Sequence, residues 1–134
     1  MEALLTPDQF AARTVGIPWV RWRSDFDGCD CFGLIVLWFR HVLGVDLGAV
    51  PQTDIAEGFS QATGWIECPP EAGATCWMAW RNGAPSHCGV LLTIDLVLHA
   101  QENVRQPPGS VRVTRLSIIE RAYGRLTFYR YAPC

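Results

Sequence analysis

Apolar residues are densest between positions 31 and 44, where they recur at helical spacing from Leu34 to Leu43. Gly44 follows as a natural stop, because glycine readily takes the left-handed conformation that ends many helices. Apolar side chains occupy nearly every side of this helix. We therefore expect a helix that is buried at the centre of the fold.

Three other stretches have the pattern of a helix start. In Thr6-Pro7-Asp8-Gln9, threonine suits the N-cap, proline the first helical position and glutamine the third, so a helix should begin here and end before Gly16. Asp54-Ile55-Ala56-Glu57 and Ser117-Ile118-Ile119-Glu120 resemble capping boxes. They predict short helices over residues 54–62 and 117–124.

The second half of the chain has the pattern of β-strands. Residues 74–80 and 87–94 flank Asn82-Gly83, a dipeptide typical of tight hairpin turns. Further strands are expected at residues 96–101, 111–116 and 126–131, and loops at residues 16–28 and 65–73. A buried helix followed by antiparallel strands predicts one α+β domain over residues 1–134.

Composition narrows the class of protein. The 134 residues are about half apolar, which is enough for one domain with a real core and argues against disorder. The net charge is −2 and the basic residues are scattered, so we expect neither nucleic-acid binding nor membrane insertion. The start of the sequence, MEALLTPDQF, lacks the basic and apolar regions of a secretory signal. We therefore expect synthesis in the cytosol.

Six cysteines are many for a cytosolic chain, where thiols stay reduced and clustered cysteines are typical of catalytic or metal sites. Cys29-Asp30-Cys31 could be a metal clip, half of a disulfide pair, or the front end of a catalytic helix. The other cysteines fit a structural zinc site poorly, since such sites use two sets of closely spaced pairs. No metal or cofactor is expected. Cys76 and Cys88 are expected to be buried.

Cys31 opens the predicted buried helix. The unpaired N–H groups and the positive end of the helix dipole at such a position stabilise a thiolate. The same N–H groups can stabilise the oxyanion of a tetrahedral intermediate. A free thiol, with a pKa of about 8.5, is mostly protonated at neutral pH, so a nucleophile here also needs a base.

The chain offers three histidines as bases. His41 lies ten residues after Cys31 on the same helix, or roughly 15 Å along its axis, and cannot reach the thiol. His87 and His99 lie on consecutive predicted strands, which can bring two side chains to the same face of a sheet. One could take the thiol proton while the other orients it.

Three short sequence motifs resemble those of the NlpC/P60 family of cysteine peptidases. They are Asp30-Cys31-Phe32-Gly33-Leu34-Ile35, His87-Cys88-Gly89-Val90 and Leu98-His99-Ala100, and they occur in the family's order. The resemblance extends from about Thr6 to Tyr131. It implies a papain-like α+β fold, with the catalytic helix packed on an antiparallel sheet, and a Cys–His–His mechanism through an acyl-enzyme.

The resemblance also implies a substrate and a location. The family's usual reaction is hydrolysis of peptidoglycan stem peptides between D-glutamate and the following diamino acid. The short phage-encoded branch, associated with tail-tip proteins, is the most similar, and its C-terminal Tyr-Arg strand matches Tyr129-Arg130. We therefore expect a component of a virion tail tip that acts at the cell wall or periplasm and has tail-tip or hub proteins as partners.

Several positions depart from the family pattern. Trp19 stands where the family has a tyrosine near the oxyanion, and an indole N–H can donate a hydrogen bond but not accept one. Trp22-Arg23 replaces a Gly-Gly pair, so these side chains either narrow the site or dock on a neighbour. Asp30 is expected to fix the loop before the helix, with contact to a substrate amine as the alternative.

Two other functional interpretations stay open. The chain could be a structural subunit of a tail tip, with an occluded or vestigial peptidase site. It could also be a bacterial housekeeping hydrolase, although the absence of a recognisable signal peptide weakens this interpretation.

Overall fold

The computed structural model describes residues 3–47, 65–103 and 105–131, and an antiparallel sheet of six strands dominates them. The strands are β3 (Trp65–Glu67), β4 (Cys76–Arg81), β5 (Ala84–Leu91), β6 (Leu96–Glu102), β7 (Gly109–Arg115) and β8 (Arg125–Tyr131). Their order across the sheet is β3-β8-β4-β5-β6-β7. The α+β class expected from the sequence is confirmed.

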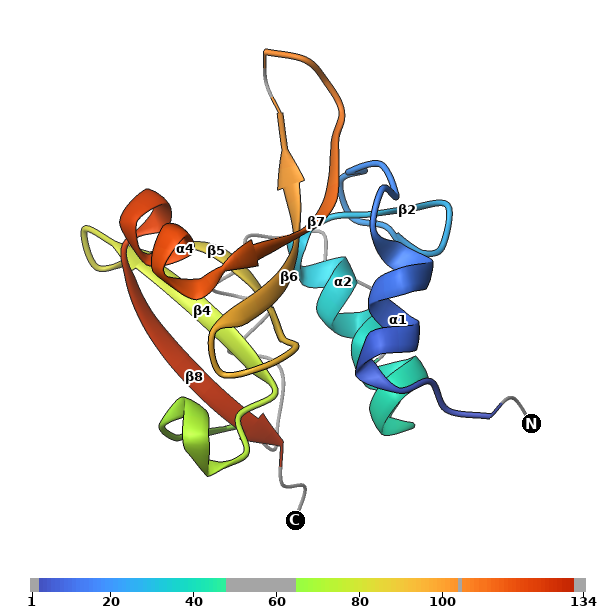
Figure 1. Cartoon of the computed structure of the whole chain (residues 1–134). Helices are drawn as coiled ribbons and strands as arrows, with labels where there is room; N and C mark the ends of the chain where they lie inside the picture. Colours follow the sequence, from blue (N-terminus) through green and yellow to red (C-terminus); the bar gives the residue numbers. More distant parts are fainter. Residues whose placement is uncertain (1–2, 48–64, 104, 132–134) are drawn as a thin grey trace.

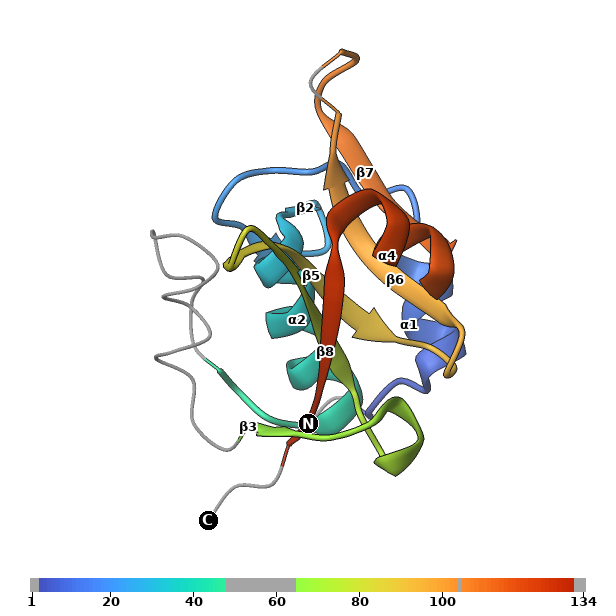
Figure 2. The ribbon, with the colours of Figure 1, turned by 90° about the vertical axis from the view of Figure 1, so that its left-hand side faces the viewer.

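Helices lie on both sides of this sheet (Figure 1). Helices α1 (Pro7–Thr14) and α2 (Cys31–Trp38) pack on one side, and α4 (Leu116–Tyr123) packs on the other, as the turned view in Figure 2 also shows. None of the helices in the described residues is long and apolar enough to cross a membrane.

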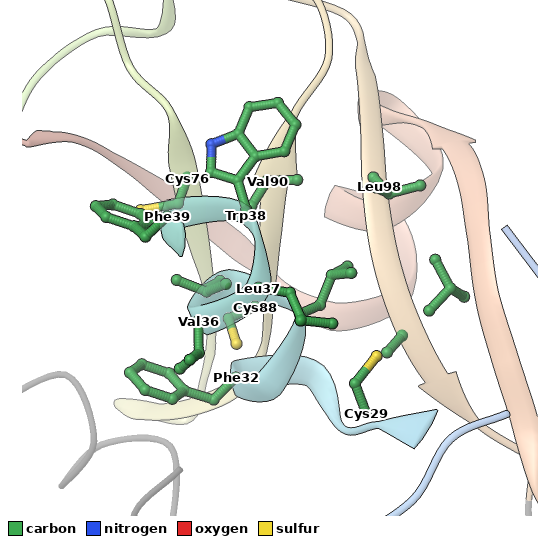
Figure 3. Close-up of a cluster of buried hydrophobic side chains, with 14 of the residues drawn as sticks. Cys29, Phe32, Val36, Leu37, Trp38, Phe39, Cys76, Cys88, Val90 and Leu98 are labelled. Carbon is green, nitrogen blue, oxygen red and sulfur yellow. The ribbon is translucent and has the colours of Figure 1, made fainter. Parts of the chain in front are cut away.

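Helix α2 confirms the prediction of a buried central helix. Every residue from Phe32 to Trp38 is buried. A π-helical turn, η1 (Phe39–Leu43), extends α2, and Gly44 ends it in the left-handed conformation with φ of 73°. In Figure 3, side chains from this helix lie against Cys88 and Val90 of β5 and Leu98 of β6.

Local sequence signals also fix α1 and the first hairpin. Thr6 and Gln9 form the predicted capping box, and α1 ends at Thr14, before Gly16. Asn82 and Gly83 form the predicted two-residue turn between β4 and β5, and both have positive φ, as tight hairpin turns of this kind require. The predicted strands at 96–101, 111–116 and 126–131 correspond to β6, β7 and β8.

Two predicted loops were wrong in part. Residues 65–73 contain β3 and a short 3-10 turn, η2 (Pro70–Ala72), and β3 pairs with β8. Trp65 explains the strand, because its ring packs on Phe39 at 4.9 Å between centroids and on Tyr131 at 6.0 Å. These partners are distant in sequence. Residues 16–28 contain β1 (Ser24–Asp25) and the first residue of β2 (Gly28–Cys29), which pair with each other.

The predicted capping box at residues 117–120 was also wrong. Helix α4 begins one residue earlier, at Leu116, and its N-cap residue Arg115 makes no side-chain cap. Its first N–H donates to the Asp95 carbonyl in the turn between β5 and β6 (2.9 Å), so a tertiary contact fixes this start. The predicted end at Gly124 is confirmed. The predicted helix at residues 54–62 lies outside the described residues.

Candidate active site

Cys31 is the first residue of α2, and Asp30 is its N-cap. One carboxylate oxygen of Asp30 accepts the Gly33 N–H (2.7 Å), and the other accepts the Trp22 N–H (2.6 Å). Asp30 is buried, and this burial raises the pKa of its carboxyl group. Both oxygens bind backbone N–H groups, so Asp30 fixes the loop before the helix, as expected from the sequence.

Gly33 lets the loop lie directly against the start of the helix. A Cβ atom at this position would collide with the backbone carbonyl of Arg23, and would lie 2.9 Å from a carboxylate oxygen of Asp30. Close packing therefore requires a glycine at this position of the motif around Cys31. Together, Asp30 and Gly33 hold the first turn of α2, and with it Cys31, in a fixed position.

His87 of β5 and His99 of β6 are joined in the structure, as expected from their places on consecutive strands. Nε2 of His87 lies 2.9 Å from Nδ1 of His99. Nε2 of His99 in turn lies 2.8 Å from the hydroxyl of Thr114 on β7. Since Nε2 of His87 is engaged with His99, Nδ1 is the ring nitrogen that remains to accept a proton.

Burial keeps both imidazoles neutral near pH 7. Burial, followed by the neighbouring His99, lowers the pKa of His87 to about 3. Burial, followed by the positive charge of Arg112, lowers the pKa of His99 to about 4. A neutral His87 can act as a general base, because it has an unprotonated ring nitrogen.

Trp77 supports the histidine pair from within the sheet. This fully buried residue packs at right-angled or tilted geometry, with its ring centroid 5.5 Å from that of His87 and 6.4 Å from that of His99. Gly89 leaves room for the indole, since a Cβ there would lie 2.7 Å from it and 2.5 Å from the Leu98 carbonyl. From the sequence, Trp77 could be part of the core or of a substrate platform with Trp65 and Trp80, and core packing was the preferred interpretation; the residue is fully buried.

Tyr123, at the end of α4, covers one face of His87. The two rings are stacked, with 4.3 Å between centroids and 27° between planes. The Ser86 hydroxyl donates to the Tyr123 carbonyl (2.8 Å), and the Arg81 guanidinium donates to the Ala122 carbonyl (2.7 Å). These bonds tie the end of α4 to the β4–β5 hairpin. Sequence reasoning missed Tyr123, because nothing local connects this helix to the histidines.

A cavity of about 310 Å³ brings Cys31 and His87 to one place. Its lining residues are Trp19, Cys31, Ser86, His87, Ala100, Glu102 and Tyr123. Trp19 therefore lies at the site, as expected for the position that replaces the family's tyrosine. Glu102 and Tyr123 were not anticipated from the sequence.

Trp22 and Arg23 lie outside the lining of this cavity. Arg23 instead forms a salt bridge with Asp25 (2.8 Å), and Trp22 is 43% exposed with a φ of 63°. The contribution of Trp22 to the site is its backbone N–H, which binds Asp30. His41 packs its ring on Phe26, at 4.7 Å between centroids.

The other cysteines differ from Cys31 in their surroundings. Burial raises the pKa of Cys29 to about 12. Burial, followed by a hydrogen bond with the Cys31 side chain, raises the pKa of Cys88 well above its ordinary value. Among the described residues, all five cysteines are free thiols, and no cluster of three or more His, Cys, Asp or Glu side chains could hold a metal ion.

Comparisons with known proteins identify the fold. No family model and no curated protein matches the chain. A solved structure, the NlpC/p60 domain of the peptidoglycan hydrolase SagA, matches with a TM-score of 0.61. The match covers 92% of this chain and 95% of that one, at 22% sequence identity. The chain has the NlpC/P60 fold. The papain-like architecture expected from the sequence motifs is thereby confirmed.

Proposed function

We propose that this protein is a cysteine peptidase in which Cys31 is the nucleophile, His87 the general base and His99 the residue that orients His87. One observation carries the proposal. Cys31, at the head of a buried helix, lines the same cavity as His87, and His87 is bonded through its far nitrogen to His99. A nucleophile, a base and an orienting group are the parts that covalent acyl transfer requires.

The reaction follows from these positions. Nδ1 of His87 takes the thiol proton, and the Cys31 thiolate attacks the scissile carbonyl carbon. The backbone N–H of Cys31 and the indole N–H of Trp19 stabilise the oxyanion. His87 then gives its proton to the leaving amine, and an acyl-enzyme remains on Cys31. Water, activated by His87, releases the acid and restores the thiol.

The substrate that we propose is the stem peptide of peptidoglycan, cleaved between D-glutamate and the following diamino acid. Two findings support it: the three sequence motifs that resemble those of the NlpC/P60 family, and the shared fold with a domain of a peptidoglycan hydrolase. No cofactor enters the reaction. We further propose that the protein acts at the cell wall as part of a phage tail tip, with tail-tip or hub proteins as partners.

A second candidate is a structural tail subunit with a closed site. The stacking of Tyr123 on His87 favours it, because the aromatic ring covers a face of the base. In this alternative Cys31 is not activated, although all three catalytic side chains are present.

Thiol alkylation separates the two candidates. The purified protein is incubated with a small alkylating reagent from pH 5 to 9, and the modified cysteines are mapped by mass spectrometry. A peptidase should label rapidly at Cys31 well below pH 8 and lose this reactivity in His87→Ala. The half-buried Cys68 serves as an internal reference. Labelling of Cys31 no faster than Cys68 at every pH would overturn the peptidase proposal in favour of the closed subunit.

Hydrolysis of purified peptidoglycan fragments then tests the substrate. The products, identified by mass spectrometry, show which bond is broken. Cys31→Ala should abolish hydrolysis and leave the fold intact. Residual hydrolysis by that variant would refute Cys31 as the nucleophile.

A further inference from the structure

The hydrogen-bonded chain at the site does not end at His99. Thr114 of β7 continues it, with its hydroxyl 2.8 Å from Nε2 of His99. In the β6–β7 pairing, Arg112 lies opposite His99 and Thr114 lies opposite Val97. Because side chains alternate along a strand, Arg112 and Thr114 face the same side of the sheet as His99. Thr114 is thus placed beside the histidine pair by the register of the sheet.

The bond between the two histidines contains a single proton, and its position decides whether His87 can act as a base. If Nε2 of His87 donates to Nδ1 of His99, then Nδ1 of a neutral His87 is free to accept the thiol proton. If Nδ1 of His99 donates instead, the proton of His87 must sit on its own Nδ1. In that second arrangement, His87 cannot take a proton from Cys31.

We propose that Thr114 is a positioning residue that selects the first arrangement. A threonine hydroxyl can donate or accept, and the role that we assign to Thr114 is that of acceptor. Nε2–H of His99 then donates to it, which leaves Nδ1 of His99 unprotonated and able to accept from His87. The consequence for catalysis rests on the proposed peptidase function. The tautomer itself does not, because it is a property of the folded protein.

The charges around His99 act in the same direction. Arg112 opposes a second proton on His99, and a doubly protonated His99 would donate from both nitrogens. The other titratable groups that face the pair are Tyr123 on α4, which stacks on His87, and Cys31 and Glu102, which line the same cavity as His87. Tyr123 is neutral near pH 7, as a phenol ordinarily is, and burial raises its pKa further. Burial, followed by the positive charge of Arg112, lowers the pKa of His99 and keeps it neutral, and Thr114 determines which nitrogen bears its proton.

Nitrogen-15 NMR of the histidine rings tests the proposal directly. At pH 7, the wild-type protein should show both His87 and His99 as Nε2–H tautomers. Thr114→Val, which keeps the shape but removes the hydroxyl, should shift part of the His99 population to Nδ1–H. Thr114→Ser should retain the wild-type tautomers. Unchanged tautomers in Thr114→Val would overturn the proposal.

Alkylation of Cys31 gives a second readout. Thr114→Val should slow labelling about three- to tenfold at pH 7, the effect of losing one hydrogen bond, while Thr114→Ser stays within about twofold of wild type. Above pH 9 the rates should converge, because the thiol ionises without help from His87. A purely structural defect would instead slow labelling equally at every pH, and would count against the proposal.

Two further variants complete the test. Thr93→Val makes the same chemical change in the β5–β6 turn. There the Thr93 hydroxyl donates to the Asp95 carboxylate and accepts the backbone N–H groups of Asp95 and Leu96, and it bonds with no histidine. This variant should leave the tautomers and the labelling unchanged. Thr114→Ala serves if Thr114→Val fails to fold. Slow labelling in the wild type with both rings in the expected tautomer would reject the peptidase function but retain the role of Thr114. Rapid labelling of Cys31 that is unaffected by Thr114→Val would reject the role of Thr114 but retain the peptidase function.

Discussion

The two faces of the sheet differ in chemistry, although the same strands supply both. The face toward α2 is apolar, and β5 contributes Cys88 and Val90 to it. The face toward α4 has its own apolar cluster around Trp77, but it also includes the bonded pair His87 and His99. Neighbouring residues of one strand thus serve either the dry core or the polar site. Because side chains alternate between the two faces along a strand, a residue of the apolar core can be the immediate neighbour of a residue of the polar site.

The proposed nucleophile and the proposed base come from opposite faces of the sheet. Cys31 belongs to the helix that packs on the apolar face, whereas His87 projects from the other face. They meet in the cavity, whose lining includes Ala100 from the α2 face and Tyr123 from α4. Substitutions on the α4 face should therefore change reactivity first, and substitutions on the α2 face should change stability first.

Among substitutions in the sheet, the largest expected effect is the loss of activity in His87→Gln. Removal of a general base typically costs about 10²- to 10⁴-fold in rate, while glutamine preserves much of the volume and polarity of histidine. The rate of hydrolysis of peptidoglycan fragments measures this effect, and thermal unfolding checks the fold. His41→Gln, the same change on the far end of the α2–η1 helix, should leave the rate unchanged. Equal losses in the two variants would contradict the division between the faces.

Substitutions on the α2 face should lower stability and leave the reactivity of Cys31 unchanged. Leu37 is 1% exposed in the middle of α2, so Leu37→Ala should lower the free energy of unfolding by about 2–5 kcal/mol. Denaturant titration measures the loss, and the folded fraction should still label at Cys31 with the wild-type pH dependence. Ile94→Ala, at a residue 61% exposed, should change stability by less than about 0.5 kcal/mol. A Leu37→Ala variant that stays stable but loses reactivity would contradict the expectation that the α2 face mainly supports stability.

The sequence predicted best where a local signal decides the structure. The capping box of Thr6 and Gln9, the Asn82-Gly83 turn and the stop at Gly44 each act through residues close in sequence. The apolar pattern places Cys31 at a helix start, and the strand pattern places His87 and His99 on adjacent strands, and both placements match the structure. Periodicity and spacing are sufficient for such features.

The prediction failed where distant partners decide. Strand β3 exists because Trp65 packs on aromatic residues from elsewhere in the chain, and α4 begins where the β5–β6 turn accepts its first N–H. Tyr123 and Thr114 were missed for the same reason. Each contacts a histidine only through the tertiary packing of α4 or the register of β7, and neither has a local signal.

The polar face should also make stability depend on pH. The folded-state pKa values of His87 and His99, about 3 and about 4, lie below the ordinary value near 6.5. Between these limits the unfolded chain binds more protons, so stability is full above pH 6.5 and is lost as the pH falls. The pair should lose ~3 kcal/mol between pH 6.5 and 5. Denaturant titration at several pH values measures this loss.

A double variant isolates that contribution. His87→Gln with His99→Gln removes both titrating groups, so its stability should change much less than the wild type's over the same range. Remaining above pH 4.5 keeps the range clear of most carboxylate titration, including that of Asp25, whose lowered pKa would add to the loss at more acidic pH. A parallel pH dependence in the two proteins would show that the histidines are not buried in neutral form.

The smallest expected effect concerns the aromatic cover of His87. Tyr123→Ala removes a stacked ring, whose contribution beyond burial is typically about 0.5–1.5 kcal/mol, and exposes the imidazole to water. Because burial is the main cause of the low pKa of His87, its pKa should rise toward 6.5, as an NMR titration of the ring would show. Tyr123→Phe keeps the ring and should keep the low pKa. If Tyr123→Ala leaves the pKa unchanged, the sheet and Trp77 alone desolvate the base, and α4 is not part of what separates the polar face from water.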